Sequence, residues 1–135
     1  MSVTVLGFDF GLKKIGIAVG QTVTKTANPL TILKAKNGVP DWTDIKKLII
    51  EWDVDTLIVG LPLNMDGTEQ FITKQAKKFG EQLKDHFQLP VIFVDERLTT
   101  VAARDEMHST LKGAARFEKA DSMSAKLIVE SWLSV

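Results

Sequence analysis

The sequence contains no cysteine, only two histidines, and no apolar run that approaches membrane-spanning length. Without cysteine, neither a disulfide nor a thiolate metal site is available, and with only His86 and His108 a zinc site is disfavoured. The N-terminus lacks the basic-then-apolar layout of a signal peptide. These absences exclude a disulfide scaffold and favour a protein of the reducing cytoplasm that does not engage a membrane.

The chain also has no net charge, because 17 basic and 17 acidic residues cancel. A nucleic-acid-binding protein is expected to be basic overall, so the balance argues against a uniformly basic surface. Basic residues nevertheless collect in three places: Lys13 and Lys14; Lys74, Lys77 and Lys78; and Lys112, Arg116 and Lys119. Each cluster is either a solvated helix or loop face or a contact surface for an anionic partner, and composition leaves both interpretations open.

The order of predicted elements favours one α/β domain over residues 1–135. Apolar runs and alternation predict strands at 3–10, 15–19, 29–33, 56–59 and 91–94. Helical periodicity predicts helices at 43–52, around 72–83, at about 100–107 and at about 119–133. Three successive strands followed by alternating helices and strands are typical of a mixed sheet with helices on both faces.

Two acids stand in unusual places. Asp9 lies near the end of an apolar strand, where a carboxylate costs several kcal/mol unless a cation, a metal or several donors compensate it. Asp121 heads an apolar helix stripe, because Ala125, Ile128 and Trp132 follow it at i+4, i+7 and i+11. An Asp in the first turn of a helix also gains about 0.3–1 kcal/mol from the helix dipole, but that explanation does not account for its alignment with the stripe.

A third acid follows the strand at 91–94. Asp95 and Glu96 point to opposite faces of the sheet, so only one of them can share a site with Asp9, and alternation alone leaves open which. Arg97 could pair with either neighbour. Carboxylates at two strand ends and at a helix start favour a hard divalent cation such as Mg²⁺, and two such ions can flank a phosphodiester.

Four segments of the chain resemble the YqgF family, also called the RuvX or Holliday junction resolvase family, whose members are linked to pre-16S rRNA processing. The segments are GFDFGLKKIGIA (7–18), VGLPLNMDGTE (59–69), VDERLTT (94–100) and ADSMSAKLIVESWL (120–133). Residues 27–32 also match, so the resemblance covers nearly the whole chain in order.

The resemblance implies an RNase H-like fold with a five-stranded mixed sheet and helices on both faces. It implies that Asp9, Glu96 and Asp121 are the catalytic acids and ligands of Mg²⁺ or Mn²⁺, and so chooses Glu96 over Asp95. The implied substrate-binding residues are Lys13, Lys14, Asn64, Arg97, Thr99, Lys112 and Arg116. Lys14 stands where the family commonly has Arg, which keeps the charge but loses bidentate phosphate geometry.

The activity implied is metal-dependent hydrolysis of phosphodiester bonds in the precursor of 16S rRNA. Because the chain has no net charge, a protein or the ribosomal particle could supply part of the affinity for RNA, and we expect the protein to be a monomer or weak homodimer. Three alternatives stay open. The first is resolution of four-way DNA junctions, and the second is a non-catalytic RNA-binding assembly factor. The third is nucleotide binding, because residues 9–16 also resemble the phosphate hairpin of actin-like ATPases.

Overall fold

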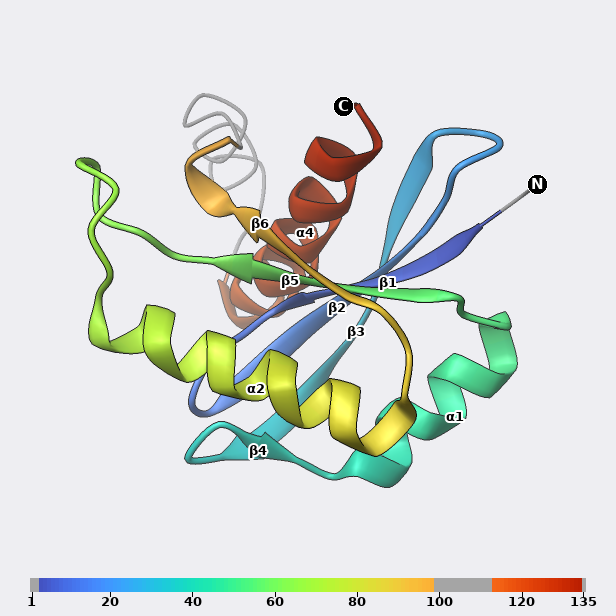
Figure 1. Cartoon of the computed structure of the whole chain (residues 1–135), viewed down its shortest axis with the longest axis horizontal. Coiled ribbons are helices and arrows are strands. Elements are labelled where there is room, and N and C mark those ends of the chain that lie inside the picture. The colour runs from blue at the N-terminus through green and yellow to red at the C-terminus, as the bar shows by residue number, and fades with distance from the viewer. Residues whose placement is uncertain (1–2, 99–112, 135) are drawn as a thin grey trace.

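The computed structural model describes residues 3–98 and 113–134, with the backbone alone at 98 and 113–122. A mixed six-stranded sheet of order β4-β3-β2-β1-β5-β6 lies between α1 and α2 on one face and α4 on the other (Figure 1). The strands are β1 (Thr4–Asp9), β2 (Lys14–Gln21), β3 (Thr26–Lys36), β4 (Val39–Pro40), β5 (Thr56–Leu61) and β6 (Val91–Asp95). The helices are α1 (Trp42–Trp52), α2 (Phe71–Phe87), α4 (Gly113–Leu133) and the 3₁₀ turn η1 (Glu96–Leu98).

The predicted mixed sheet with helices on both faces is confirmed, with one strand more than expected. The additional strand, β4, is two residues long and pairs with the end of β3, which is too short for sequence alternation to reveal. The last helix begins at Gly113 rather than at Lys119. The helix predicted at 100–107 lies outside the described residues.

Strand β3 runs to Lys36, beyond the predicted end at Leu33. Its last residues, Lys34-Ala35-Lys36, have low strand propensity, but they pair with β2 and β4 on either side. Pro29 lies where the β2–β3 register shifts and where β4 has not yet begun, an irregular edge position at which a residue without an N–H is tolerated.

The sheet separates two apolar cores, and β1 contributes to both. Leu6 and Phe8 pack with α1 and α2, whereas Val5 packs with α4. Because successive strand side chains alternate between faces, Gly7 and Asp9 share the α4 face with Val5.

Helix α4 packs closely on the sheet because glycines lie beneath it. A Cβ atom at Gly7 or at Gly20 would overlap Val129, and one at Gly60 would stand 2.5 Å from Ile128 Cδ1. The carboxyl-terminal end of α4, with Leu133, lies by Thr22 just past β2, next to where β1 begins. The Ala125 carbonyl lies over Gly7 farther along β1. The helix therefore runs antiparallel to β1, and its earlier turn at 121 lies toward the end of β1.

We expect Gly7→Ala to destabilise the fold by about 1–3 kcal/mol, because the added methyl overfills the contact with Val129. The double variant Gly7→Ala/Val129→Ala restores the space, so its loss should fall short of the sum of the single losses by about 0.5–3 kcal/mol. Urea denaturation of the four proteins measures this coupling. Strictly additive losses would contradict close packing at this point.

Candidate metal and nucleic-acid site

Asp9 and Glu96 lie at the same edge and on the same face of the sheet. Strands β1, β5 and β6 are parallel, with Phe8, Val59 and Phe93 in register, so their carboxyl ends meet. Glu96 follows β6 directly, and a Cβ at Gly60 would lie 2.7 Å from its Oε1 atom. The Glu96 carboxylate therefore lies over Gly60 on the α4 face, which Asp9 shares.

The third predicted acid is placed by the backbone of α4. Asp121 stands one turn before Ala125, on the helix stripe that continues through Ile128 into the α4 core. Since α4 runs antiparallel to β1, this turn lies toward the strand end that carries Asp9. The structure describes the backbone of Asp121 but not its side chain.

Asp95 is held in an ion pair with Arg97. Its Oδ1 accepts from the Arg97 backbone N–H at 2.8 Å, and its Oδ2 accepts from Nη2 at 2.7 Å and from Nε at 3.0 Å. These hydrogen bonds lower the pKa of Asp95 and raise the pKa of Arg97. Of the two acids that the sequence left open, Asp95 thus has a structural partner, and Glu96 lies on the face of Asp9.

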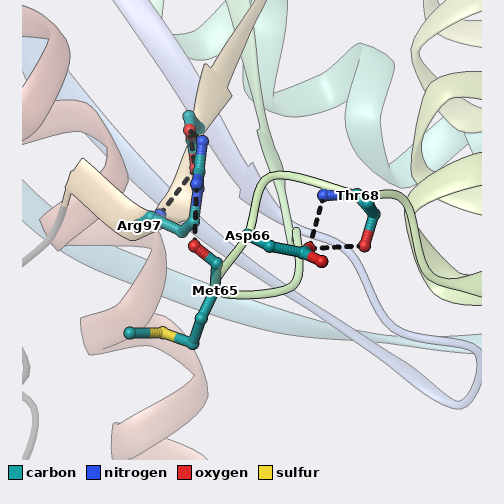
Figure 2. A network of polar contacts seen from close by, with 5 residues as sticks. Met65, Asp66, Thr68 and Arg97 are labelled. Atoms are coloured by element: carbon teal, nitrogen blue, oxygen red, sulfur yellow. Dashed lines mark hydrogen bonds and ion pairs between the residues drawn. The ribbon is translucent and has the colours of Figure 1, made fainter.

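Arg97 also connects the end of β6 to the loop between β5 and α2. Its Nη1 donates to the Met65 carbonyl at 3.2 Å, as Figure 2 shows. Within the loop, Asp66 Oδ1 accepts from the backbone N–H and the hydroxyl of Thr68, at 3.0 and 2.6 Å, and these bonds lower the pKa of Asp66 (Figure 2). The Asn64 amide donates to the same hydroxyl at 2.9 Å. The loop that carries Asn64 is therefore internally braced and tied to the residue after Glu96.

The remaining predicted contact residues fall into two groups. Lys13 lies in the turn between β1 and β2, and Lys14 begins β2; both are exposed beside the end of β1. Thr99 and Lys112 lie outside the described residues, and Arg116 is described by its backbone in α4 alone. Contact of these residues, and of Asn64 and Arg97, with a substrate stays a prediction; the Arg97 side chain is 38% exposed.

The sequence analysis did not place Lys34 and Lys36 beside the predicted site. The expected third strand ended at Leu33, so both residues fell in a presumed connection. The register of β3 places Lys34 directly opposite Lys14, and both β3 lysines are exposed. The signal that could have found them is the alternation of Ile32, Lys34 and Lys36 with Leu33 and Ala35.

The described residues fit part of an oxygen-ligand metal site. Glycine at position 60 leaves the space that the Glu96 carboxylate occupies, and a side chain there would fill it. Carboxylate oxygens are the ligands that Mg²⁺ prefers. Among the side chains that the structure describes, no group of three acids or histidines could hold a metal ion, and Asp121 would have to supply the third ligand. His86 stacks on Trp42 at 4.2 Å between ring centroids, near the end of α2.

We expect the Asp95–Arg97 pair to stabilise the fold in a pH-dependent way. Because the folded-state pKa of Asp95 is lowered, its contribution is complete above the unfolded pKa of about 4 and is lost as pH falls through the folded value. Asp95→Asn should therefore make the free energy of unfolding fall less steeply on acidification below about pH 4. Urea denaturation across this range measures the slope, and an identical slope in both proteins would contradict the assignment.

Residues 3–98 and 113–134 include no helix long and apolar enough to cross a membrane.

Comparison with known proteins identifies the family. The profile described as "RuvX: Holliday junction resolvase" matches residues 3–135. Proteins named "Putative pre-16S rRNA nuclease" are similar to this chain: that of Nitrosococcus oceani is 54% identical, covering 96% of this chain and 86% of the relative. That of Haemophilus ducreyi is 52% identical, covering 98% and 96%.

Solved structures share the fold at low sequence identity. T. thermophilus RuvC, in complex with Holliday junction substrate, has a TM-score of 0.58 at 14% identity, covering 96% of this chain and 94% of that one. The Fowlpox virus resolvase, in complex with substrate Holliday junction DNA, has a TM-score of 0.53 at 14% identity, covering 98% and 97%. The expected RNase H-like fold is confirmed by this likeness. With its family profile matched from residue 3 to residue 135, the chain belongs to the RuvX family.

Proposed function

We propose that this protein is a metal-dependent nuclease that hydrolyses phosphodiester bonds in the precursor of 16S rRNA, in the cytoplasm and on the ribosomal particle. The names of its relatives support this substrate. The observation that carries the proposal is the meeting of Asp9 and Glu96 at one edge and on one face of the sheet, toward which α4 brings Asp121.

Asp9, Glu96 and Asp121 would hold one or two Mg²⁺ ions, or Mn²⁺ in their place. A bound divalent ion supplies Lewis-acid activation of water and stabilises negative charge on the reacting phosphate. The three carboxylates on their own would repel a phosphodiester, so they serve the reaction by binding cations and fixing their position. Lys13 and Lys14, exposed beside the end of β1, would hold the neighbouring phosphates as point charges.

The Asp95–Arg97 pair would act by position. It ties the β5–α2 loop to the end of β6, directly after Glu96, so Asn64 lies at the edge where the acids meet. A braced loop loses little conformational entropy when a polymer binds, which favours a fixed orientation of the bound strand.

Resolution of four-way DNA junctions is the second candidate. The description of the matching family and the likeness to RuvC in complex with a junction favour it. Cutting two opposing strands requires two sites related by symmetry, and hence a stable dimer. A monomer or weak homodimer, which we propose for this protein, suits the RNA substrate better.

We expect Asp9→Asn, Glu96→Gln and Asp121→Asn each to reduce magnesium-dependent cleavage of precursor 16S rRNA by roughly 100-fold or more. Loss of a metal ligand should reduce activity by more than the roughly 10–100-fold that is typical when a residue hydrogen-bonded to a ligand is removed. The rate of product formation, read on a gel with end-labelled RNA, measures this.

The matched control is Asp85→Asn, which removes one exposed carboxylate near the distal end of α2 and should cleave as the unaltered protein does. Equal cleavage by the Asp9→Asn variant would assign the activity to a contaminant. Absence of cleavage by all proteins, with RNA binding retained, would favour the non-catalytic assembly factor. A four-way DNA junction run in parallel decides between the two nuclease substrates.

A further inference from the structure

Three lysines from two strands form a basic stripe on the α4 face of the sheet. Lys14 begins β2, and Lys34 and Lys36 end β3; the three are called the lysine stripe below. Leu33 and Ala35 pack against the core on the α1–α2 side, so Lys34 and Lys36 point to the opposite face. Lys14 shares that face, because it lies opposite Lys34 in the antiparallel register.

The backbone beneath the stripe is fixed by hydrogen bonds between two turns. Ala35 N–H donates to the Lys13 carbonyl at 2.8 Å, and Gly38 N–H donates to the Leu12 carbonyl at 2.9 Å. Asn37 and Gly38, with φ of 52° and 81°, form the tight β3–β4 turn. Figure 1 shows this hairpin beside the β1–β2 turn. The stripe is therefore presented by paired strands and not by a free loop.

The stripe costs the fold stability. Like charges directly opposite one another on neighbouring strands are destabilising, and Lys14 and Lys34 form such a pair. Among the side chains that the structure describes (residues 3–97 and 123–134), no ion pair joins any of the three lysines to a carboxylate. An uncompensated basic surface of this kind suits an anionic partner that supplies the missing charge.

The stripe also lies close to Asp9. Asp9 is opposite Gly16 on β2, and Lys14 is two residues farther along that strand on the same face. From strand spacing, the Cα atoms of Lys14 and Lys34 lie roughly 8 and 12 Å from that of Asp9. A strand of nucleic acid with a phosphate at the acids would thus reach the stripe with its neighbouring phosphates.

We propose that the lysine stripe, with Lys34 and Lys36 as its unassigned members, binds the phosphate backbone of the nucleic acid next to the cleaved bond. The proposal rests on the proposed nuclease function for the identity of the acid site, but it concerns binding and is tested without cleavage. The partner follows from charge complementarity, since a polyanion alone offers several phosphates in a row along such a track.

The test compares Lys34→Gln/Lys36→Gln with Lys46→Gln/Lys47→Gln. The second pair is exposed on α1, which covers the other face of the sheet, so both variants lose the same charge. Binding of a fluorescein-labelled RNA spanning the 5′ end of mature 16S rRNA is followed by anisotropy in EDTA, at several salt concentrations. A labelled four-way DNA junction is the second probe.

We expect the stripe variant to bind roughly ten-fold or more weakly, with the slope of log K against log[salt] reduced by about 1–2. The α1 variant should keep its affinity within about two-fold, because exposed charges beyond a Debye length are screened. The melting temperature of the stripe variant should equal or exceed that of the unaltered protein, because a like-charge pair is removed. In a cleavage assay, KM should rise and kcat should stay.

Equal loss of affinity in both variants, or an unchanged affinity in the stripe variant, would overturn the proposal, as would failure of the unaltered protein to bind either probe. If the protein binds through the stripe but cleaves neither probe with Mg²⁺, the proposed nuclease function is wrong, whereas the proposal that the stripe binds phosphates stands. The unaltered protein could also bind the junction more strongly than the RNA and lose that binding in the stripe variant. This result would support binding of phosphates by the stripe and would indicate that the substrate is DNA.

Discussion

The close approach of α4 to the glycine-bearing face of the sheet is the contact on which the rest of the structure depends. Gly7 and Gly20 leave room for Val129, so the helix sits directly over β1 and β2. Gly60 leaves room for both Ile128 and the Glu96 carboxylate. One missing side chain therefore serves the packing of the helix and the placement of an acid. A larger residue at position 60 would displace either the Ile128 side chain or the Glu96 carboxylate.

Much of this arrangement is readable from the sequence because it depends on periodicity. Alternation in β1 and the helical stripe below Asp121 both predict burial, and the cores bear out the strands and the helix that carry them. The choice between Asp95 and Glu96 is different, because it depends on which face of a neighbouring strand each residue meets. The partner of Asp95 is the residue two positions later, and the space for Glu96 is on another strand, at Gly60.

The end of β3 was not predicted from the sequence for a related reason. Lys34-Ala35-Lys36 has little intrinsic preference for a strand, and it becomes one because its neighbours offer unpaired N–H and C=O groups on both sides. Local propensity cannot report a partner that lies twenty residues earlier in the chain, here Lys14. The same limit applies to Arg97, whose bond to the Met65 carbonyl joins loops that are separated by two secondary-structure elements.

A protein with no net charge can still bind a polyanion if the fold brings basic residues together on one surface. In this protein, lysines gather at the edge of the sheet where β1 ends. The three lysines of the stripe and Lys13 would neutralise about three or four phosphates, which for a single strand gives a salt slope near −2 to −3. Such a slope is shallow beside that of proteins with many phosphate contacts, so affinity for bare RNA should be modest at physiological salt. Selection of one phosphodiester must then come from the shape in which the substrate is presented. Under the proposed function, a folded ribosomal precursor held in place by its own particle would provide that shape without requiring a more basic protein.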